Sequence, residues 1–531
     1  MKATITKLWR SLWASHDQTK DKLRIIPGAQ STVASQAYSR PQLVGLLLGP
    51  ALFLLTVLFF SPEGLSDQGK LVLGITLWIA TWWITEAIPI PATSLLPILL
   101  LPATGALSNA TVTAAYGDDI IYLFLGGFFI ATAMEKWNLH KRIALAIIAF
   151  VGTSTQRILL GFMLATGFLS MWVSNTAAVM MMLPMALAIT AQVATSMKGM
   201  AGEQDVPSFE KALVFGVGYG GTIGGLGTLI GTPPNIILAA QVEELFGATI
   251  SFAGWMIIGA PLVLVLLIAT WFYLGHVAFP TKLAQLPGGR QLIQRERDAL
   301  GKIGYEEKVV AAVFVGAAFM WITRGVIWVD IVPELRDGMI AVAAAVLLFV
   351  FPAKTVGQSR VLDWKDSKEI PWGILLLFGG GLAIAAGFRE SGLSSWMGNQ
   401  LTFFDSFHLI VMITGATLLI LFLTEITSNT ATATMILPVV ASLALALEIH
   451  PYALMIPCAM AANCAFMLPV GTPPNAIIFA TEKIRITEMM RVGFVLNIIA
   501  AVLIVLLVYY VVPLVWGIDL NSVPVEFTTT Q

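Results

Sequence analysis

The chain has 531 residues, of which 57% are hydrophobic and 11% are charged, whereas soluble proteins have about 25% charged residues. The formal net charge of −1 excludes nucleic acid as the main partner. The composition therefore predicts an all-α polytopic membrane protein. Its two cysteines, Cys458 and Cys464, lie in one apolar segment, and we expect small buried residues there rather than a disulfide framework.

The chain begins with a polar stretch, residues 1–41, that contains Lys and Arg but no long apolar run. This stretch lacks the pattern of a cleaved signal peptide, so we expect a cytoplasmic arm. About 11 transmembrane helices follow, predicted near residues 42–61, 70–88, 92–104, 119–135, 212–248, 252–279, 309–323, 337–352, 371–388, 452–480 and 492–516. Two further apolar stretches, 158–195 and 407–447, are interpreted as re-entrant hairpins that enter and leave on one side.

Two short motifs occur twice. Ser-Asn-Thr-Ala at residues 174–177 returns 254 positions later at 428–431, and Gly-Thr-Pro-Pro-Asn at 231–235 returns 240 positions later at 471–475. We place the 14 missing positions in the polar stretch 196–211. A duplicated apolar unit with helix-breaking residues at equivalent depths is typical of secondary transporters. The predicted parts are an arm (1–41), a first helix with an outer loop (42–69), repeat 1 (70–279), a cytoplasmic linker (280–308), repeat 2 (309–516) and an external tail (517–531).

Basic residues indicate the orientation. With the N-terminus inside, the inner segments contain 26 of the 30 Lys and Arg residues, as the positive-inside rule requires. The exceptions are Lys70, Arg324, Arg336 and Arg389. This pattern predicts a protein of the plasma (inner) membrane with a cytoplasmic N-terminus and an external C-terminus. The first hairpin then opens to the inside and the second to the outside, so the two repeats have inverted topology.

The repeated motifs are suited to binding ions. Ser and Asn at a hairpin tip cap helix N–H groups, and a helix N-terminus attracts anions. In Gly-Thr-Pro-Pro-Asn the two prolines break the helix and free carbonyl oxygens for a small cation. Capping alone and a kink at the membrane surface are the alternatives. The symmetric pairing of the motifs, and the apolar sequence on both sides of each break, favour an ion site within the membrane.

The absence of basic residues indicates how an anion could bind. No Lys or Arg lies within seven positions of any of the four motif segments, so an anion at this depth would lack a fixed countercharge nearby in sequence. Hydroxyl, amide and carbonyl oxygens suit Na⁺. Bound sodium ions would supply the positive charge and couple the anion to a gradient.

These motifs, together with Trp-Ile-Thr-Glu-Ala-Ile-Pro at residues 83–89, resemble the divalent anion/sodium symporter family, which includes the sodium-coupled di- and tricarboxylate cotransporters. The resemblance extends from about residue 40 to residue 516. It implies a homodimer in which each protomer has a scaffold part and a transport part that moves like an elevator. It also implies two broken helices, one at each Gly-Thr-Pro-Pro-Asn segment.

The resemblance also implies the site residues. Sodium site 1 would consist of Ser170, Ser174, Asn175 and Gly231. Sodium site 2 would consist of Thr424, Ser428, Asn429 and Gly471. The substrate carboxylates would contact Asn175, Thr176, Asn429, Thr430, Thr472 and Pro473.

The expected function is import of dicarboxylates of the succinate, malate and fumarate class, coupled to sodium. A sodium-independent exchanger, or a transporter of citrate or sulfate, is the alternative. No nucleophile–base pair or metal cluster is found, which argues against an intramembrane enzyme. Three acidic residues in or near apolar segments, Glu86, Glu135 and Glu425, are further candidates; Glu425 could instead belong to a hairpin helix or an interface.

Overall fold

The computed structural model describes residues 38–152, 154–200, 202–281, 283, 289–400 and 407–528. Within these residues the regular secondary structure is helical, apart from an isolated β-bridge between Pro352 and Arg360. The prediction of an all-helical protein is confirmed. Most of the predicted cytoplasmic arm, residues 1–37, lies outside the described residues.

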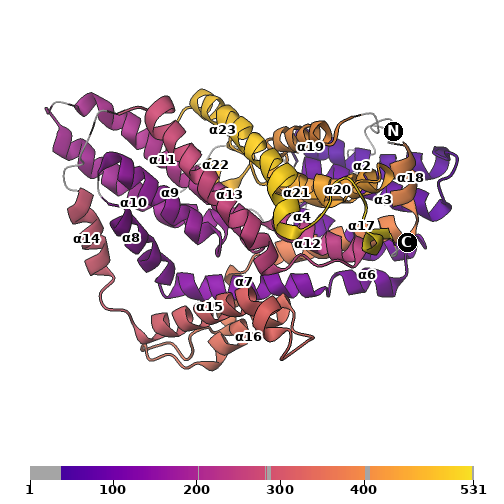
Figure 1. Cartoon of the computed structure of the whole chain (residues 1–531), viewed down its shortest axis with the longest axis horizontal. Helices are drawn as coiled ribbons and strands as arrows, with labels where there is room; N and C mark the ends of the chain where they lie inside the picture. Colours follow the sequence, from indigo (N-terminus) through magenta and orange to yellow (C-terminus); the bar gives the residue numbers. More distant parts are fainter. Residues whose placement is uncertain are drawn as a thin grey trace, which may run out of the picture.

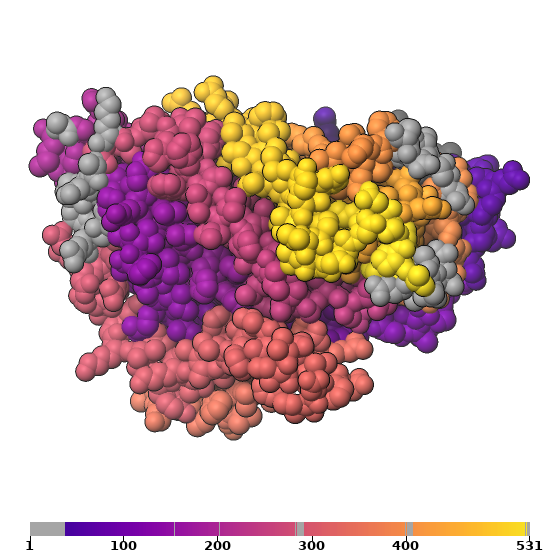
Figure 2. All heavy atoms as spheres, in the orientation of Figure 1, coloured from indigo at the N-terminus to yellow at the C-terminus, as the bar shows by residue number. Residues whose placement is uncertain are grey.

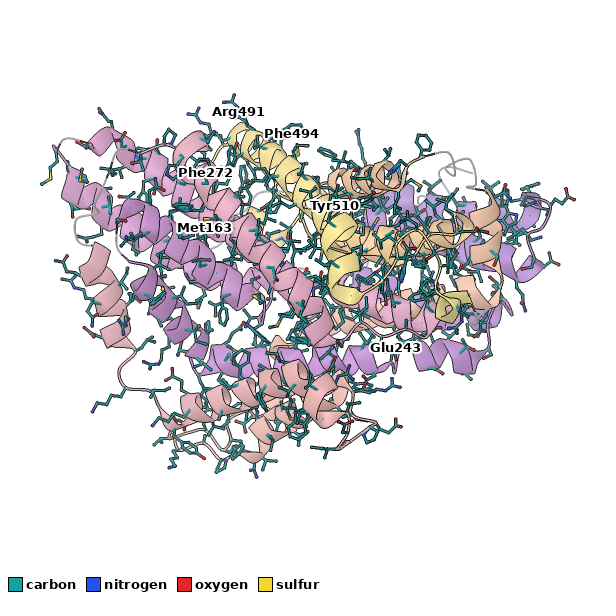
Figure 3. All side chains as sticks on the ribbon, in the orientation of Figure 1. Met163, Glu243, Phe272, Arg491, Phe494 and Tyr510 are labelled. Atoms are coloured by element: carbon teal, nitrogen blue, oxygen red, sulfur yellow. The ribbon has the colours of Figure 1, made fainter. Side chains whose placement is uncertain are left out.

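Many of the helices are apolar enough to cross a membrane. In the described part of the chain, eight segments qualify by length and composition: Arg40–Phe59, Asn109–Lys136, Asn175–Met197, Phe252–Ala278, Tyr305–Trp328, Trp372–Glu390, Asn429–Ala446 and Ile486–Trp516. Shorter apolar helices of 10–17 residues accompany these eight segments. Large apolar side chains cover the outside, among them Phe272, Phe494 and Tyr510, each about half exposed (Figure 3). An apolar exterior of this kind is suited to contact with lipid.

The first half of the chain contains the helices up to the linker (Figure 1). They are α2 (Arg40–Phe59), α3 (Asp67–Thr85), α4 (Ile90–Thr93), α5 (Leu96–Ala103), α6 (Asn109–Ala115), α7 (Asp119–Lys136), α8 (Leu139–Val151), α9 (Thr155–Ser170), α10 (Asn175–Met197), η1 (Glu203–Asp205), α11 (Val206–Gly224), η2 (Gly225–Gly227), α12 (Pro233–Phe246), α13 (Phe252–Phe272) and η3 (Tyr273–Ala278).

The second half follows the linker helix α14 (Gly289–Ala299). Its helices are α15 (Tyr305–Thr323), η4 (Arg324–Trp328), α16 (Asp337–Val350), η5 (Trp364–Glu369), α17 (Trp372–Glu390), α18 (Leu393–Gln400), α19 (Leu409–Thr424), α20 (Asn429–Ala446), α21 (Tyr452–Ala462), α22 (Pro473–Phe479), α23 (Ile486–Leu506), η7 (Leu507–Val511), α24 (Val512–Trp516) and α25 (Val525–Thr528). Helix α23, in yellow, crosses the middle of the face shown in Figure 2.

Two helical hairpins correspond between the halves. Helices α9 and α10 begin at Thr155 and Asn175, and helices α19 and α20 begin at Leu409 and Asn429, in both cases 254 positions later. Four residues form each tip. In Figure 1 the first hairpin lies at the left of the molecule and the second lies right of its centre. This arrangement brings the two Ser-Asn-Thr motifs toward the same central region.

The two breaks in the helices also correspond. Pro233 and Pro473 each occupy the first position of the helix that follows the break, α12 or α22, where a missing N–H costs least. Helix α12 has 14 residues, whereas α22 has only 7. As a result, the helices that follow start 234 positions apart, at Phe252 and Ile486. The halves therefore differ in a second place besides the polar stretch that the motif spacing indicated.

Candidate cation and anion binding site

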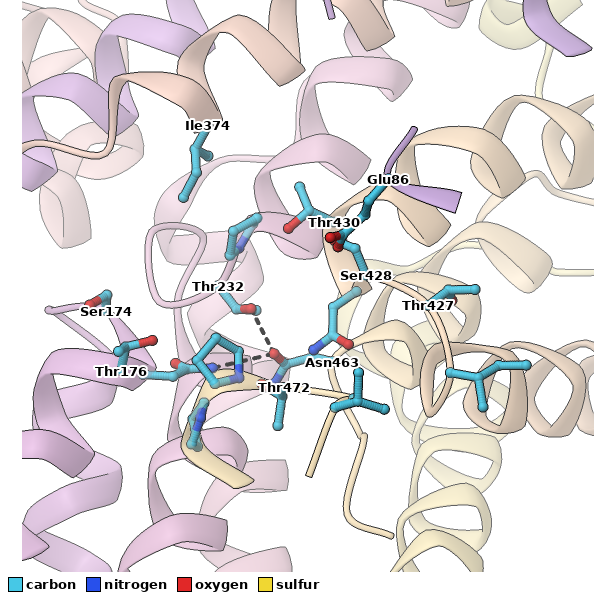
Figure 4. Close-up of a pocket in the computed structure, with 18 of the residues that line it drawn as sticks. Glu86, Ser174, Thr176, Thr232, Ile374, Thr427, Ser428, Thr430, Asn463 and Thr472 are labelled. Carbon is cyan, nitrogen blue, oxygen red and sulfur yellow. Dashed lines mark hydrogen bonds between the residues drawn. The ribbon is translucent and has the colours of Figure 1, made fainter. Parts of the chain in front are cut away.

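A cavity of about 540 Å³ lies between the two hairpin tips and the two broken helices (Figure 4). Ten of the predicted site residues line it: Ser174, Asn175, Thr176, Gly231, Ser428, Asn429, Thr430, Gly471, Thr472 and Pro473. The other two, Ser170 and Thr424, are fully buried behind the tips. Residues 254 or 240 positions apart in sequence are thus brought to one cavity.

The hairpin tips direct helix N-termini toward this cavity. Ser174 is the N-cap of α10, and its hydroxyl accepts a hydrogen bond from the Ala177 N–H at 3.2 Å. Ser428 is the N-cap of α20 in extended geometry, without such a side-chain bond. The partial positive charge at the two helix starts favours a negatively charged group in the cavity.

An oxygen cluster lies behind the first tip. The Ser170 hydroxyl is 2.6 Å from Asn175 Oδ1 and 2.6 Å from the Gly221 carbonyl oxygen. A hydroxyl has one proton, so it can donate to only one of these two acceptors. Gly231 packs against the Gly225 carbonyl, where an added Cβ would lie 2.5 Å from the oxygen. A hydroxyl, an amide oxygen and carbonyl oxygens gathered in one place are a suitable donor set for a hard cation.

The second tip has the same construction. The Thr424 hydroxyl is 2.6 Å from Asn429 Oδ1 and 2.7 Å from the Ala462 carbonyl oxygen. If the Asn429 amide is turned over, its nitrogen donates to the Gly471 carbonyl at 3.0 Å and to the Ala462 carbonyl at 3.2 Å. Before this turn, Asn429 Oδ1 faces only hydrogen-bond acceptors. An amide oxygen directed there needs a cation between the oxygens, and an amide nitrogen can satisfy them without one.

One further polar side chain lies at the centre of the cavity. Asn463, which follows α21, is fully buried and lines the cavity. Its Oδ1 accepts a hydrogen bond from the Thr232 hydroxyl at 2.6 Å and a longer one from Asn175 Nδ2 at 3.4 Å (Figure 4). Its Nδ2 donates to the Thr222 carbonyl at 2.7 Å. Asn463 thus connects residues of the first repeat with the broken helix of the second.

The acidic candidates have different surroundings. Glu425 is buried in the second tip but does not line the cavity. Its carboxylate accepts hydrogen bonds from the backbone N–H groups of residues 466–468, at 2.8–3.1 Å, and from Asn497 at 2.8 Å. It therefore supports the unwound part of the second broken helix. Glu86 lines the cavity, and Glu135 is exposed away from it.

The charge of the lining is unusual for an anion site. Among the residues that line the cavity there is one ionisable side chain, Glu86, and no Lys or Arg. Polar contacts to an anion therefore come from hydroxyl, amide and backbone groups. The positive charge that a dianion requires has to come from bound cations and from the helix N-termini.

Two central polar residues are among the cavity residues that sequence reasoning missed. Thr232 lines the cavity, and its equivalent in the second repeat, Thr472, was predicted, so the repeat itself could have identified it. The repeat did not point to Asn463, because the motif spacing of 240 aligns it with Ile223. The only signal for Asn463 was an amide in an otherwise apolar segment.

Comparisons with known proteins identify close relatives. A family model for the sodium:sulfate symporter transmembrane region matches residues 41–517. The sodium-dependent dicarboxylate transporter SdcS of Staphylococcus saprophyticus is 57% identical over 492 residues, covering 92% of this chain and 95% of the relative. SdcS of Staphylococcus aureus (strain bovine RF122 / ET3-1) is 58% identical over 489 residues, covering 91% and 94%.

Two solved structures resemble the fold at low sequence identity. The YdaH transporter of Alcanivorax borkumensis, described as having an unusual topology, has a TM-score of 0.51 at 10% identity and covers 84% of this chain and 99% of its own. MtrF of Neisseria gonorrhoeae has a TM-score of 0.52 at 13% identity, with 90% and 96% covered. These likenesses concern the fold alone. The family model and the relatives show that this chain belongs to the sodium:sulfate symporter family, which confirms the resemblance of its motifs.

Proposed function

We propose that this protein imports dicarboxylates of the succinate, malate and fumarate class together with sodium ions. The observation that carries the proposal is the pair of oxygen clusters at Ser170 and Thr424, in each of which a buried hydroxyl lies 2.6–2.7 Å from the amide of the following asparagine and from a backbone carbonyl oxygen. Sodium ions in these clusters would complete the coordination. The names of the SdcS relatives, sodium-dependent dicarboxylate transporters, support both parts of the proposal.

The lining of the cavity supports an anionic substrate that binds with cations. Helix α10 begins at the cavity with Asn175 and Thr176, and helix α20 begins there with Asn429 and Thr430. Two such groups, one from each repeat, suit a substrate with a carboxylate at each end. The volume is within the range of roughly 300–1,000 Å³ that is usual for small-molecule sites.

Alternating access is the mechanism we infer. In this proposal the hairpins and broken helices form a transport part, and helices such as α7, α15 and α16 form a scaffold part. The transport part moves like an elevator within a homodimer. The internal duplication and the position of the cavity between the repeats support this mechanism.

The direct test is uptake of labelled succinate into liposomes that contain the purified protein. With an inward sodium gradient we expect uptake above the level of protein-free liposomes. Replacing sodium by choline should remove it. Equally fast uptake in choline that requires a dicarboxylate inside the liposomes would replace the symporter by an exchanger.

A competition experiment defines the substrate class. We expect unlabelled malate and fumarate to reduce succinate uptake, whereas equal concentrations of citrate or sulfate should reduce it less. The description of the family model names sulfate, so sulfate is the second candidate. Strong inhibition by sulfate together with weak inhibition by malate would reverse the assignment.

A further inference from the structure

Asn463 has its backbone in one repeat and its side-chain partners in the other. Its backbone follows α21 of the second repeat. Its amide contacts Asn175, Thr222 and Thr232, which all belong to the first repeat. Close by, the Tyr219 hydroxyl of the first repeat donates to the Phe466 carbonyl of the second at 2.9 Å. The Asn463 amide is thus the link that reaches the first oxygen cluster from the second repeat.

The neighbour of Asn463 belongs to the other oxygen cluster. The Ala462 carbonyl accepts the hydrogen bond of the Thr424 hydroxyl at 2.7 Å, so it is part of the cluster of the second repeat. The dipeptide Ala462–Asn463 therefore touches both clusters, the second through its carbonyl and the first through the Asn463 amide. A displacement of the Ala462 carbonyl is transmitted to the Asn463 side chain through one peptide bond, which is rigid.

The contact with Asn175 determines what that residue presents to the first cluster. Asn175 Nδ2 lies toward Asn463 Oδ1 at 3.4 Å, while Asn175 Oδ1 lies 2.6 Å from the Ser170 hydroxyl. An acceptor beside one end of an amide favours the orientation that directs the amide oxygen to the other end. Residues that orient ligands in this way strongly affect the affinity of ion sites.

We propose that Asn463 is a positioning residue that couples the two cation clusters. A cation at the cluster of Thr424 fixes the Ala462 carbonyl and with it Asn463. Asn463 then holds the Asn175 amide with its oxygen toward Ser170, and this orientation prepares the first cluster for the next cation. The inference rests on the proposed sodium coupling and adds to it a physical origin for cooperativity between the sodium ions.

The first test compares two substitutions of similar size in liposomes. Asn463→Leu removes the bridge, and we expect the sodium dependence of uptake to lose its cooperativity, with a Hill coefficient close to one. Asn463→Asp keeps the shape and adds a negative charge. A charge at this distance should change affinities by about tenfold, so half-saturating sodium should fall while half-saturating succinate rises.

These opposite shifts distinguish positioning from a structural role. If Asn463 only filled space, both variants would weaken sodium and succinate binding together or only reduce the amount of folded protein. That result, or an unchanged Hill coefficient in the Asn463→Leu variant, would overturn the inference. Absence of sodium dependence in the unmodified protein would instead overturn the proposed function, and the inference with it.

The second test is a double-mutant cycle. Asn463→Leu is combined with Thr232→Val, which removes the hydroxyl that donates to Asn463. We expect the combined effect on half-saturating sodium to differ from the product of the single effects by about fivefold, as for residues in contact. Thr427→Val is the matched control, because Thr427 lines the same cavity but contacts Leu423 and Thr432. If the effects on half-saturating sodium simply multiply both for Asn463→Leu with Thr232→Val and for Asn463→Leu with Thr427→Val, the proposed bridge is contradicted.

Discussion

At the scale of single residues, two buried hydroxyl groups define the candidate cation clusters. Ser170 and Thr424 each lie 2.6–2.7 Å from the amide of an asparagine and from a backbone carbonyl oxygen. The family resemblance implied that each of these residues shares a site with the following asparagine. It could not predict the carbonyl groups of Gly221 and Ala462 as the other neighbours, because these come from 51 and 38 positions away.

We therefore expect the hydroxyl of Thr424 to be required for sodium binding. Thr424→Val keeps the shape but removes the oxygen, and Thr424→Ser keeps the oxygen. Loss of one ligand to a charged group costs about 1.5–3 kcal/mol, so half-saturating sodium should rise by about 10- to 100-fold in the valine variant only. The measurement is sodium-dependent succinate uptake in liposomes. Equal behaviour of the valine and serine variants would remove Thr424 from the site.

At the scale of helical elements, the duplication predicted much of the architecture. Hairpins were expected at 158–195 and 407–447, and the structure has them at 155–197 and 409–446. The sequence did not predict that only the second broken helix is held by a buried carboxylate. Glu425 binds backbone groups 41–43 positions away, whereas the equivalent position in the first repeat is Met171. Which backbone groups a buried carboxylate meets depends on packing that no local pattern encodes.

Glu425 should therefore be important for stability. Glu425→Gln replaces one carboxylate oxygen by an NH₂ group, which cannot accept the N–H groups of residues 466–468. Leaving a buried donor without its partner costs about 1–3 kcal/mol, so the purified variant should unfold at a clearly lower temperature. Glu86→Gln, at an exposed residue, is the control and should unfold like the unmodified protein. Equal unfolding temperatures for all three would show that Glu425 does not support the break.

At the scale of the whole molecule, the four basic residues outside the predicted inner segments all form ion pairs. Lys70 pairs with Asp67 at 3.3 Å and Arg324 with Asp337 at 2.8 Å. The pairs of Arg336 with Glu243 at 3.0 Å and of Arg389 with Glu244 at 2.8 Å join distant helices. Both glutamates lie near the end of α12, in the part that α22 lacks. Figure 3 shows Glu243 at this place.

Removing these two acidic groups should loosen α12 from its neighbours. Ala239 is buried on α12 and lines a second cavity beside Glu243 and Arg336. In protein without Cys458 and Cys464, a cysteine at position 239 should react faster with a membrane-impermeant thiol reagent once Glu243→Gln and Glu244→Gln are introduced. The charge exchange Glu243→Arg with Arg336→Glu keeps an ion pair at this place, so the cysteine at position 239 should again react slowly with the thiol reagent. An unchanged rate would show that the pairs do not close this region.

The orientation remains a prediction that can be tested directly. We expect the N-terminus to be cytoplasmic and the C-terminus external, since the inner segments contain 26 of the 30 basic residues, as the positive-inside rule requires. Reporters that work only in the cytoplasm should be active at the N-terminus and inactive after Thr530. Activity at both ends would contradict the two-hairpin topology.

The unequal lengths of α12 and α22 have a consequence for the direction of transport. A carrier made of two equivalent inverted halves would have the same kinetics for influx and efflux. Here one half has seven more residues in this helix, with two ion pairs on them that the other half cannot form. The two end states should therefore differ in free energy, so that the half-saturating succinate concentration differs between the two faces. The sodium gradient still sets the final accumulation.

Uptake measured separately in right-side-out and inside-out vesicles would reveal this difference between the two directions of transport. Identical half-saturating succinate concentrations on both faces would show that the halves are energetically equivalent.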